Sequence, residues 1–81
     1  MGTKEYFEMV GKNVRKYRRL KKISQIKLAQ LCELQQSFIS DIENGKRNIT
    51  LSILKKLSDS LDIDSSLLLI NQSSESTANK K

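Results

Sequence analysis

The chain has 81 residues, 15 Lys and Arg against 9 Asp and Glu, a formal charge of +6, one Cys and no His. This length is sufficient for one domain with a small core. A single Cys excludes an internal disulfide, and the absence of His argues against a zinc site and against an enzyme. With a longest apolar run of four residues and no signal-peptide pattern, we expect a cytoplasmic protein with an anionic partner, nucleic acid before a membrane surface, and no cofactor, metal or small-molecule ligand. Because Val10, Val14 and Tyr17 are needed in the core and leave no Phe or Trp face for lipid, membrane contact is not expected.

The first predicted helix covers residues 4–22, and no segment of the chain alternates as a strand would. Its inward positions recur at steps of three and four and are filled by Phe7, Val10, Val14, Tyr17 and Leu20. From Lys12 to Lys27 there are eight basic residues and no acidic one. Solvated helix faces usually mix the two signs, so this run favours an anionic partner over simple solubility.

A second, shorter helix is predicted over residues 25–32, with Ser24 as a suitable N-cap. We expect its inner face to consist of Leu28, Ala29 and Leu31. The single cysteine, Cys32, closes this helix and should be a buried thiol without a redox role.

A turn at residues 33–35 leads to a third predicted helix over residues 36–44, with Ile39 and Ile42 inward. Gly45 is expected to end this helix, because glycine adopts positive φ at little cost. Two short helices joined by a short turn behind a basic helix have the layout of a helix-turn-helix.

The remaining elements are a capped helix, a short final helix and a tail. Thr50 caps the fourth predicted helix, with inward positions at Leu51, Leu54, Leu57 and Leu61. Asp64 caps a fifth over residues 65–70. We therefore expect an all-α domain of five helices in residues 1–70, and a disordered tail in the polar residues 71–81.

Several motifs at fixed spacing resemble the Cro/repressor-type (Xre) helix-turn-helix family: Ser24-Gln25-x-x-Leu28-Ala29, residues 38–47, and the leucine repeat in residues 51–61. The likeness spans residues 11–68 and implies a Cro/repressor-like fold. Residues 46–51 look most like the controller proteins of restriction–modification systems, which are homodimeric transcription regulators that bind operator DNA. The resemblance implies such a regulator, with a phage-type or chromosomal repressor, or the DNA-binding antitoxin of a toxin–antitoxin pair, as alternatives.

Base contacts are expected from the third predicted helix, because the recognition helix of this motif lies in the major groove. Gln pairs with adenine, Ser reaches several bases, a carboxylate accepts from cytosine and an aromatic ring meets a thymine methyl. The candidates are Gln36, Ser37, Phe38, Ser40 and Asp41. Other roles remain open: Gln36 and Ser37 as helix caps, Phe38 in packing or at a dimer rim, and Asp41 in an ion pair within the protein.

Phosphate contacts are expected around this helix. In the family that the chain resembles, the residue at Gln25 hydrogen-bonds a phosphate and braces the recognition helix, and a helix N-terminus itself attracts anions. The remaining candidates are Arg15, Arg19, Asn44, Lys46, Arg47 and Asn48. For the arginines, a contribution to solubility alone is the alternative.

Three further residues carry expectations from the resemblance. The acid at Glu43 pairs with an Arg or Lys of the first helix in this family. Glu33 stands where the family usually has Gly, so either a residue with a side chain holds an unusual φ there or the turn is reshaped. Gln35 replaces the usual Ser or Thr cap, so capping of the third helix should be weaker.

The apolar run near the C-terminus suggests a homodimer. One face of a short helix cannot bury all four of its residues in the monomer, and a symmetric contact is the commonest way to cover the rest. The expected interface consists of Leu67, Leu68, Leu69 and Ile70. The alternative is that this run caps the core of its own chain.

Overall fold

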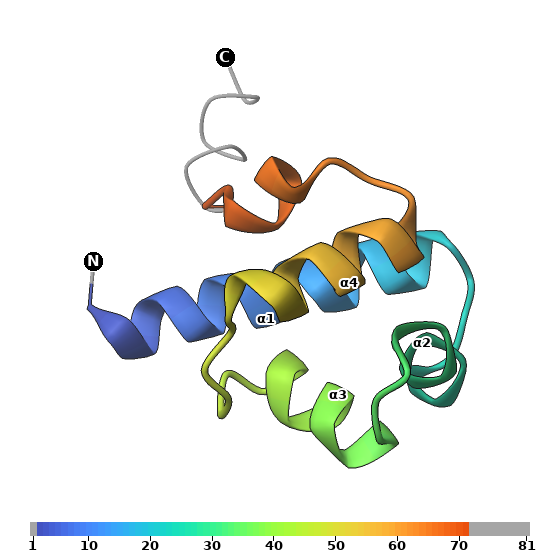
Figure 1. The fold of residues 1–81 in the computed structure, drawn as a ribbon. Helices are drawn as coiled ribbons and strands as arrows, with labels where there is room; N and C mark the ends of the chain where they lie inside the picture. Colours follow the sequence, from blue (N-terminus) through green and yellow to red (C-terminus); the bar gives the residue numbers. More distant parts are fainter. Residues whose placement is uncertain (1, 72–81) are drawn as a thin grey trace.

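The computed structural model describes residues 2–71, and within them it contains helices and no strand (Figure 1). The elements are α1 (Thr3–Leu20), α2 (Gln25–Cys32), α3 (Gln36–Glu43), α4 (Leu51–Leu61) and a 3-10 helix, η1 (Ser65–Leu69). The predicted all-α class is confirmed, but the fifth element is a 3-10 helix and not an α-helix. Of the tail expected to be disordered, only Asn71 lies among the described residues.

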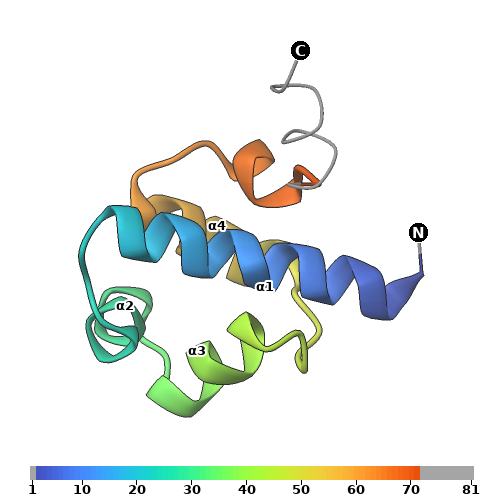
Figure 2. The ribbon, with the colours of Figure 1, turned by 180° about the vertical axis from the view of Figure 1, so that it is seen from behind.

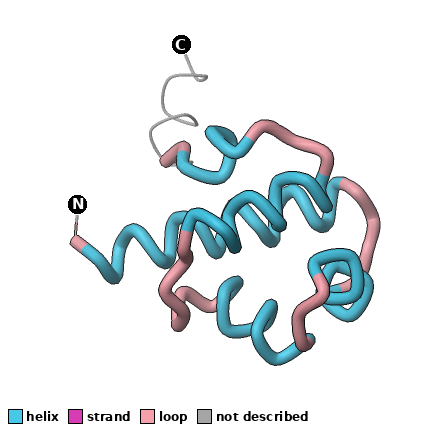
Figure 3. The backbone as a smooth tube through the Cα atoms, viewed as in Figure 1, coloured by secondary structure: helices cyan, strands magenta, loops and turns pink. Residues whose placement is uncertain are grey.

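The helices are arranged around α1. It contacts α3, α4 and η1, and α2 packs on α3 and α4. Figures 1 and 2 show α1 and α4 in the middle, α2 and α3 on one side, and η1 on the other. The tube in Figure 3 shows that the connections are short, so each helix packs against its neighbours without long loops. This places α3 at one surface of the molecule, opposite η1.

Apart from Leu68, the core is built largely from the inward positions that the helical spacing predicts. Its fully covered side chains include Val10, Val14, Leu28, Ile39, Ile42, Leu57 and Leu68. Burying an aliphatic side chain of this kind stabilises the fold by about 1.5–3 kcal/mol. The apolar stripes of α1 to α4 therefore meet in one cluster.

Three leucines expected to face inward are exposed, and those expectations were wrong. Leu20 is 67% exposed, Leu31 45% and Leu51 83%. Leu20 and Leu51 are the last residue of α1 and the first residue of α4, so both stand at helix ends. In α2 the buried face consists of Leu28, Ala29 and Cys32, and Leu31 lies to one side of that face.

Polar side chains cap three elements as the sequence predicts. Ser24 Oγ accepts from Lys27 N at 3.0 Å, and Thr50 Oγ1 accepts from Ile53 N at 3.2 Å. The Asp64 carboxylate accepts from the Ser66 backbone N–H at 2.9 Å, and this bond lowers the pKa of Asp64. Each bond satisfies a backbone N–H that has no partner within its helix.

The turn between α2 and α3 confirms two expectations from sequence. Glu33 has φ 58° and ψ 42°, the left-handed conformation that normally favours glycine. Gln35 precedes α3 without forming a side-chain capping bond. α3 ends at Glu43, so Asn44, expected to be its last residue, is instead its C-cap. The next residue, Gly45, adopts φ 72°.

The C-terminal segment is attached to α1 by a buried asparagine. Asn13 Nδ2 donates to the carbonyl of Leu68 at 2.8 Å and to that of Ile70 at 2.9 Å. Leu68 is fully buried within its own chain, which corrects its assignment to a subunit surface. Of the other three expected interface residues, Leu69 is 42% exposed, and Leu67 and Ile70 are half-buried.

Candidate nucleic-acid interface

The outer surface of α3 holds all five predicted base-contacting residues. Gln36 and Ser37 occupy its first turn and are exposed, whereas Phe38, Ser40 and Asp41 are half-buried. Inward-facing Ile39 and Ile42 anchor the helix on the core. The exposed first turn of α3 is thus polar, and the two buried isoleucines hold the helix on the core.

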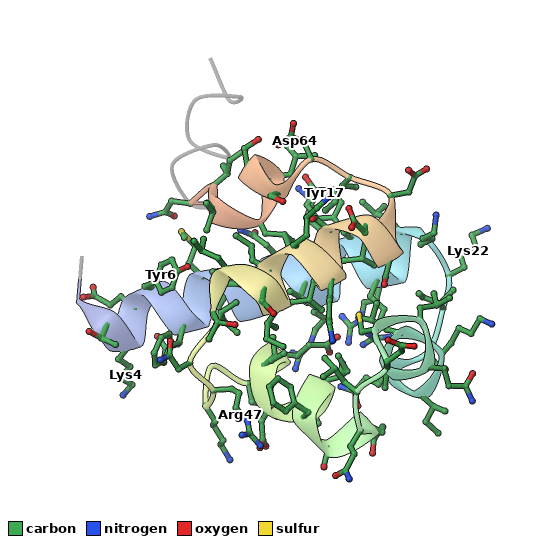
Figure 4. The ribbon with its side chains drawn as sticks, in the orientation of Figure 1. Lys4, Tyr6, Tyr17, Lys22, Arg47 and Asp64 are labelled. Carbon is green, nitrogen blue, oxygen red and sulfur yellow. The ribbon has the colours of Figure 1, made fainter. Side chains whose placement is uncertain are left out.

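The segment after α3 adds positive charge beside it. Asn44, Lys46, Arg47 and Asn48 are all exposed. The Arg47 guanidinium lies over the Phe38 ring, with Cζ 4.2 Å from the ring centroid, and Arg47 Nη2 lies 3.4 Å from Asp41 Oδ2. The arginine therefore links the segment to the first and second turns of α3, and Figure 4 shows Arg47 on the α3 side of the molecule.

These contacts bear on the alternatives left open for Phe38 and Asp41. Phe38 carries the arginine on its ring and packs partly on the core. Asp41 forms the ion pair within the protein that was one of its two possible roles. Both partners of that pair are 43% exposed, so water screens it and a competing phosphate can replace the carboxylate.

Of the two arginines predicted for phosphate on α1, one already has partners in the protein. Arg15 Nε lies 3.4 Å from Glu43 Oε1, and Arg15 Nη2 donates to Asn44 Oδ1 at 3.2 Å. Arg19 is exposed at the end of the helix. The structure therefore leaves Arg19 more accessible than Arg15.

A buried ion pair joins α3 to α1, which confirms the partner expected for Glu43. Arg18 Nε donates to Glu43 Oε2 at 2.6 Å and Arg18 Nη2 donates to Oε1 at 3.0 Å, a bidentate arrangement. Arg18 also donates to the Ile23 carbonyl at 3.0 Å. The Glu43 side chain has no exposed area, and that of Arg18 is 12% exposed.

The protonation of this pair follows from competing effects. Burial alone would raise the pKa of Glu43, but hydrogen bonds from Arg18, Gln25 and Arg15, together with the charge of Arg18, lower it overall. The hydrogen bond to Glu43 raises the pKa of Arg18 despite its burial. Both groups are therefore held in their charged forms at neutral pH.

The half-buried Gln25 connects the ion pair to the tip of α3. The resemblance implied that Gln25 braces this helix, but the sequence did not predict which side chains it contacts. Its Nε2 donates to Glu43 Oε1 at 3.0 Å, and its Oε1 accepts from Gln36 Nε2 at 2.7 Å. Gln25 and Gln36 are eleven residues apart on different helices, so no helical spacing relates them. The predicted bracing of α3 by Gln25 thus takes place through a side chain already assigned to base contact.

Cys32 is a buried thiol, as the sequence predicts. Its Sγ donates to Ser60 Oγ at 3.3 Å and to the Lys56 carbonyl at 3.6 Å. Burial raises its pKa, so the reactive thiolate is disfavoured. In residues 2–71 there is no group of three or more potential metal-ligating side chains, and no described helix is long and apolar enough to cross a membrane.

A basic and an acidic residue of the exposed surface lie on opposite sides of the molecule. In Figure 4 Arg47 lies on the α3 side, whereas Asp64 lies beside η1 on the opposite side. A rigid helix with an exposed polar tip, a basic segment after it and a second helix crossing behind it define a helix-turn-helix DNA-binding domain.

Residues 14–68 match the protein-family model for the helix-turn-helix, and the chain belongs to this family. It is similar to control protein C.SmaI of Serratia marcescens, with 37% identity over 65 residues covering 80% of this chain and 77% of that protein. It is also similar to control protein C.BamHI of Bacillus amyloliquefaciens, with 42% identity over 62 residues covering 75% of this chain and 76% of that protein.

The fold is also similar to a solved structure, the restriction-modification controller protein C.AhdI from Aeromonas hydrophila. The TM-score is 0.74 at 35% identity, and the match covers 76% of this chain and 94% of that one. The resemblance to the Cro/repressor-type family, and within it to controller proteins, is thereby confirmed.

Proposed function

We propose that this chain is the controller protein of a restriction–modification system, a homodimeric transcription regulator that binds operator DNA in the cytoplasm without a catalytic step. The observation that carries the proposal is the exposed tip of α3, where Gln36 and Ser37 stand beside a basic segment. The same helix-turn-helix family includes control proteins similar to this chain over most of their length.

In the proposed complex, α3 lies in the major groove and its side chains read base edges. Gln36 and Ser37 are the most exposed of them, half-buried Phe38 follows in the same turn, and half-buried Ser40 and Asp41 lie one turn later. Phosphates are bound by polar and basic residues around the helix, with Arg15 a weaker candidate because Glu43 and Asn44 already engage it. The other phosphate candidates are Gln25, Arg19, Asn44, Lys46, Arg47 and Asn48.

Homodimerisation is proposed through the C-terminal side of the domain. Leu69 is 42% exposed, and half-buried Leu67 and Ile70 flank it and buried Leu68. Asp64, also on this side, is on the side opposite Arg47, so a partner bound here would leave α3 accessible (Figure 4). A two-fold dimer presents its two recognition helices about 34 Å apart, one turn of the duplex.

DNA binding is tested by selecting bound duplexes from a random pool and titrating the selected site at several salt concentrations. We expect a two-fold symmetric consensus and an affinity that falls steeply with salt, because several phosphates are contacted. Gln36→Ala should cost about 1–3 kcal/mol at one base pair of each half-site. Arg47→Ala should weaken all sequences about equally, and an affinity insensitive to salt would contradict the proposal.

The subunit interface is tested by sedimentation. Leu69→Asp should yield monomers, because a carboxylate in an apolar contact loses its hydration without gaining a partner. Leu20→Asp places the same charge on another exposed leucine and should leave the dimer intact. Dimers that persist in Leu69→Asp would place the interface elsewhere.

The regulatory role is tested with a reporter gene driven by the DNA upstream of the coding sequence. Transcription should change when the protein is supplied, and an endonuclease gene should lie in the same operon. A neighbouring toxin gene, with no endonuclease gene present, would instead favour an antitoxin.

A further inference from the structure

Two contacts at the protein surface hold Arg47 against α3. The Arg47 Nη2 atom lies 3.4 Å from Asp41 Oδ2, and Arg47 Cζ lies 4.2 Å from the centroid of the Phe38 ring. The side chains of Asp41 and Arg47 are each 43% exposed. Since Arg47 is on the α3 side of the molecule (Figure 4), this ion pair lies within the surface proposed to bind DNA.

The backbone after α3 brings the two charged residues together. Gly45 adopts φ 72°, and its N–H donates to the Ile42 carbonyl at 3.0 Å. The Lys46 N–H donates to the Asp41 carbonyl at 2.9 Å. These two bonds form a Schellman motif, which turns the chain back over the end of the helix. Because Arg47 directly follows Lys46, it leaves this turn beside Asp41, and the fold of the chain itself places the pair.

The carboxylate of Asp41 and a DNA phosphate attract the same guanidinium. Asp41 is the only acidic side chain among the residues predicted to contact DNA, and a carboxylate offers a phosphate no hydrogen-bond donor. Its contact with Arg47 is long and exposed, which makes the pair weak enough for a phosphate to displace. The new phosphate contact then gains less affinity, because the free energy of the ion pair is lost when it forms.

We propose that Asp41 is an internal competitor of DNA for Arg47, and that this competition lowers the affinity for every duplex by the same factor. The inference rests on the function proposed above, since it concerns the same surface. Because a phosphate contact is at stake, the effect is independent of base sequence and of any base that Asp41 itself reaches. Asp41 thereby sets the concentration of protein at which DNA becomes occupied.

The experiment measures the affinity of the full-length wild type, Asp41→Asn and Asp59→Asn for one duplex that lacks the selected operator, at one salt concentration. Asparagine keeps the shape of aspartate without its charge, so Asp41→Asn releases the guanidinium. We expect this variant to bind about three to ten times more tightly, because each subunit of the proposed dimer loses one exposed pair. On such a duplex, base reading by Asp41 makes no contribution.

Asp59→Asn is the matched control. Asp59 forms an exposed ion pair with Lys55 at 2.9 Å on α4, so this variant removes an equal charge and also frees a basic side chain. α4 packs on α1, α2 and η1, and neither residue of this pair is among those predicted to contact DNA. We expect its affinity to stay within about twofold of the wild type, because salt screens charges that are distant from the DNA.

A double-mutant cycle separates competition from simple repulsion between Asp41 and DNA. In an Arg47→Ala protein there is no guanidinium to release, so adding Asp41→Asn should leave the affinity unchanged. By the same reasoning, Arg47→Ala should weaken binding more in the Asp41→Asn protein than in the wild type. Thermal unfolding followed by circular dichroism compares the fold of all variants, and we expect little change because both side chains are partly exposed.

The possible outcomes separate this inference from the proposed function. A wild type that binds no duplex DNA would overturn the proposed function itself. If the wild type binds DNA but Asp41→Asn binds no more tightly than Asp59→Asn, the competition does not exist. A gain that persists in the Arg47→Ala protein would equally overturn it, since repulsion alone would then explain the gain. A gain confined to proteins that retain Arg47 would support it.

Discussion

The two carboxylates Glu43 and Asp59 show how environment decides the value of an ion pair. Glu43 is held by Arg18 inside the protein, whereas Asp59 pairs with Lys55 at 2.9 Å on the surface of α4. The surface partners are 61% and 71% exposed, so their pair is screened by water. Only the buried pair is expected to matter for stability.

We therefore predict that Glu43→Ala lowers the free energy of unfolding by about 3–5 kcal/mol, because it leaves the Arg18 charge buried without its partner. Asp59→Ala, the exposed counterpart, should change it by less than about 0.5 kcal/mol. Urea unfolding measures both. Similar values for the two variants would contradict the importance assigned to burial.

Glu43 should also make the fold sensitive to acid. Its pKa in the folded protein lies below the ordinary value of 4.5, so the unfolded chain takes up the proton first as the pH falls. Stability from this group is complete above pH 4.5 and is lost as the pH falls through the lower folded pKa. Melting temperatures measured across this range should decline less steeply for Glu43→Gln, and equal slopes would count against this assignment.

At the scale of the elements, helical spacing located every helix, and ends differed by at most two residues. The first helix was expected to reach residue 22 but ends at Leu20, because Lys22 adopts φ 61°. The left-handed conformation of Glu33 was one of the two alternatives expected at that turn, whereas those at Lys22 and Asp62 were not predicted. Local sequence indicates where a helix lies, but packing decides which residue adopts the left-handed conformation that ends it.

The contact between α1 and α3 depends on a glycine in the middle of α1. A Cβ on Gly11 would lie 2.2 Å from the Ile42 carbonyl oxygen, so the two backbones approach more closely than a side chain allows. Helix propensity alone would favour alanine there by about 1 kcal/mol. Tertiary contact reverses this preference.

We predict that Gly11→Ala destabilises the protein by about 1–3 kcal/mol, since the helices must separate to admit the methyl group. Lys12→Ala, the next residue and exposed, should leave stability nearly unchanged. Urea unfolding compares the two. A stabilised Gly11→Ala would mean that α1 and α3 are less closely packed than the structure shows.

For the whole molecule, Asn13 joins the two ends of the domain. It stands on the buried side of α1 between Val10 and Val14, where the spacing leads one to expect an apolar residue. Its amide satisfies carbonyls 55 and 57 residues away, which fastens η1 to α1. The sequence therefore indicates that Asn13 has a special role, because it is a polar residue within the apolar stripe of α1. The sequence does not indicate which carbonyl groups Asn13 binds.

Asn13→Ala should cost about 1–3 kcal/mol, because it leaves the Leu68 and Ile70 carbonyls without this donor. Hydrogen exchange should increase most in residues 65–70, and dimerisation should weaken with it. Ser66→Ala tests an exposed position in the same segment and should leave the Asn13 contact intact. Unchanged exchange in Asn13→Ala would show that apolar packing alone holds the segment.

The sequence by itself determined the helical class, the positions of the helices, the caps at Ser24, Thr50 and Asp64, and the family, because periodicity, capping and motif spacing are local properties. It also placed the predicted DNA-contacting residues on α3 and around it. Only the tertiary structure decided which of them already have partners. The Arg47 contacts with Phe38 and Asp41, and the hydrogen bond from Gln36 to Gln25, join residues whose separation along the chain carries no signal, since packing alone brings them together.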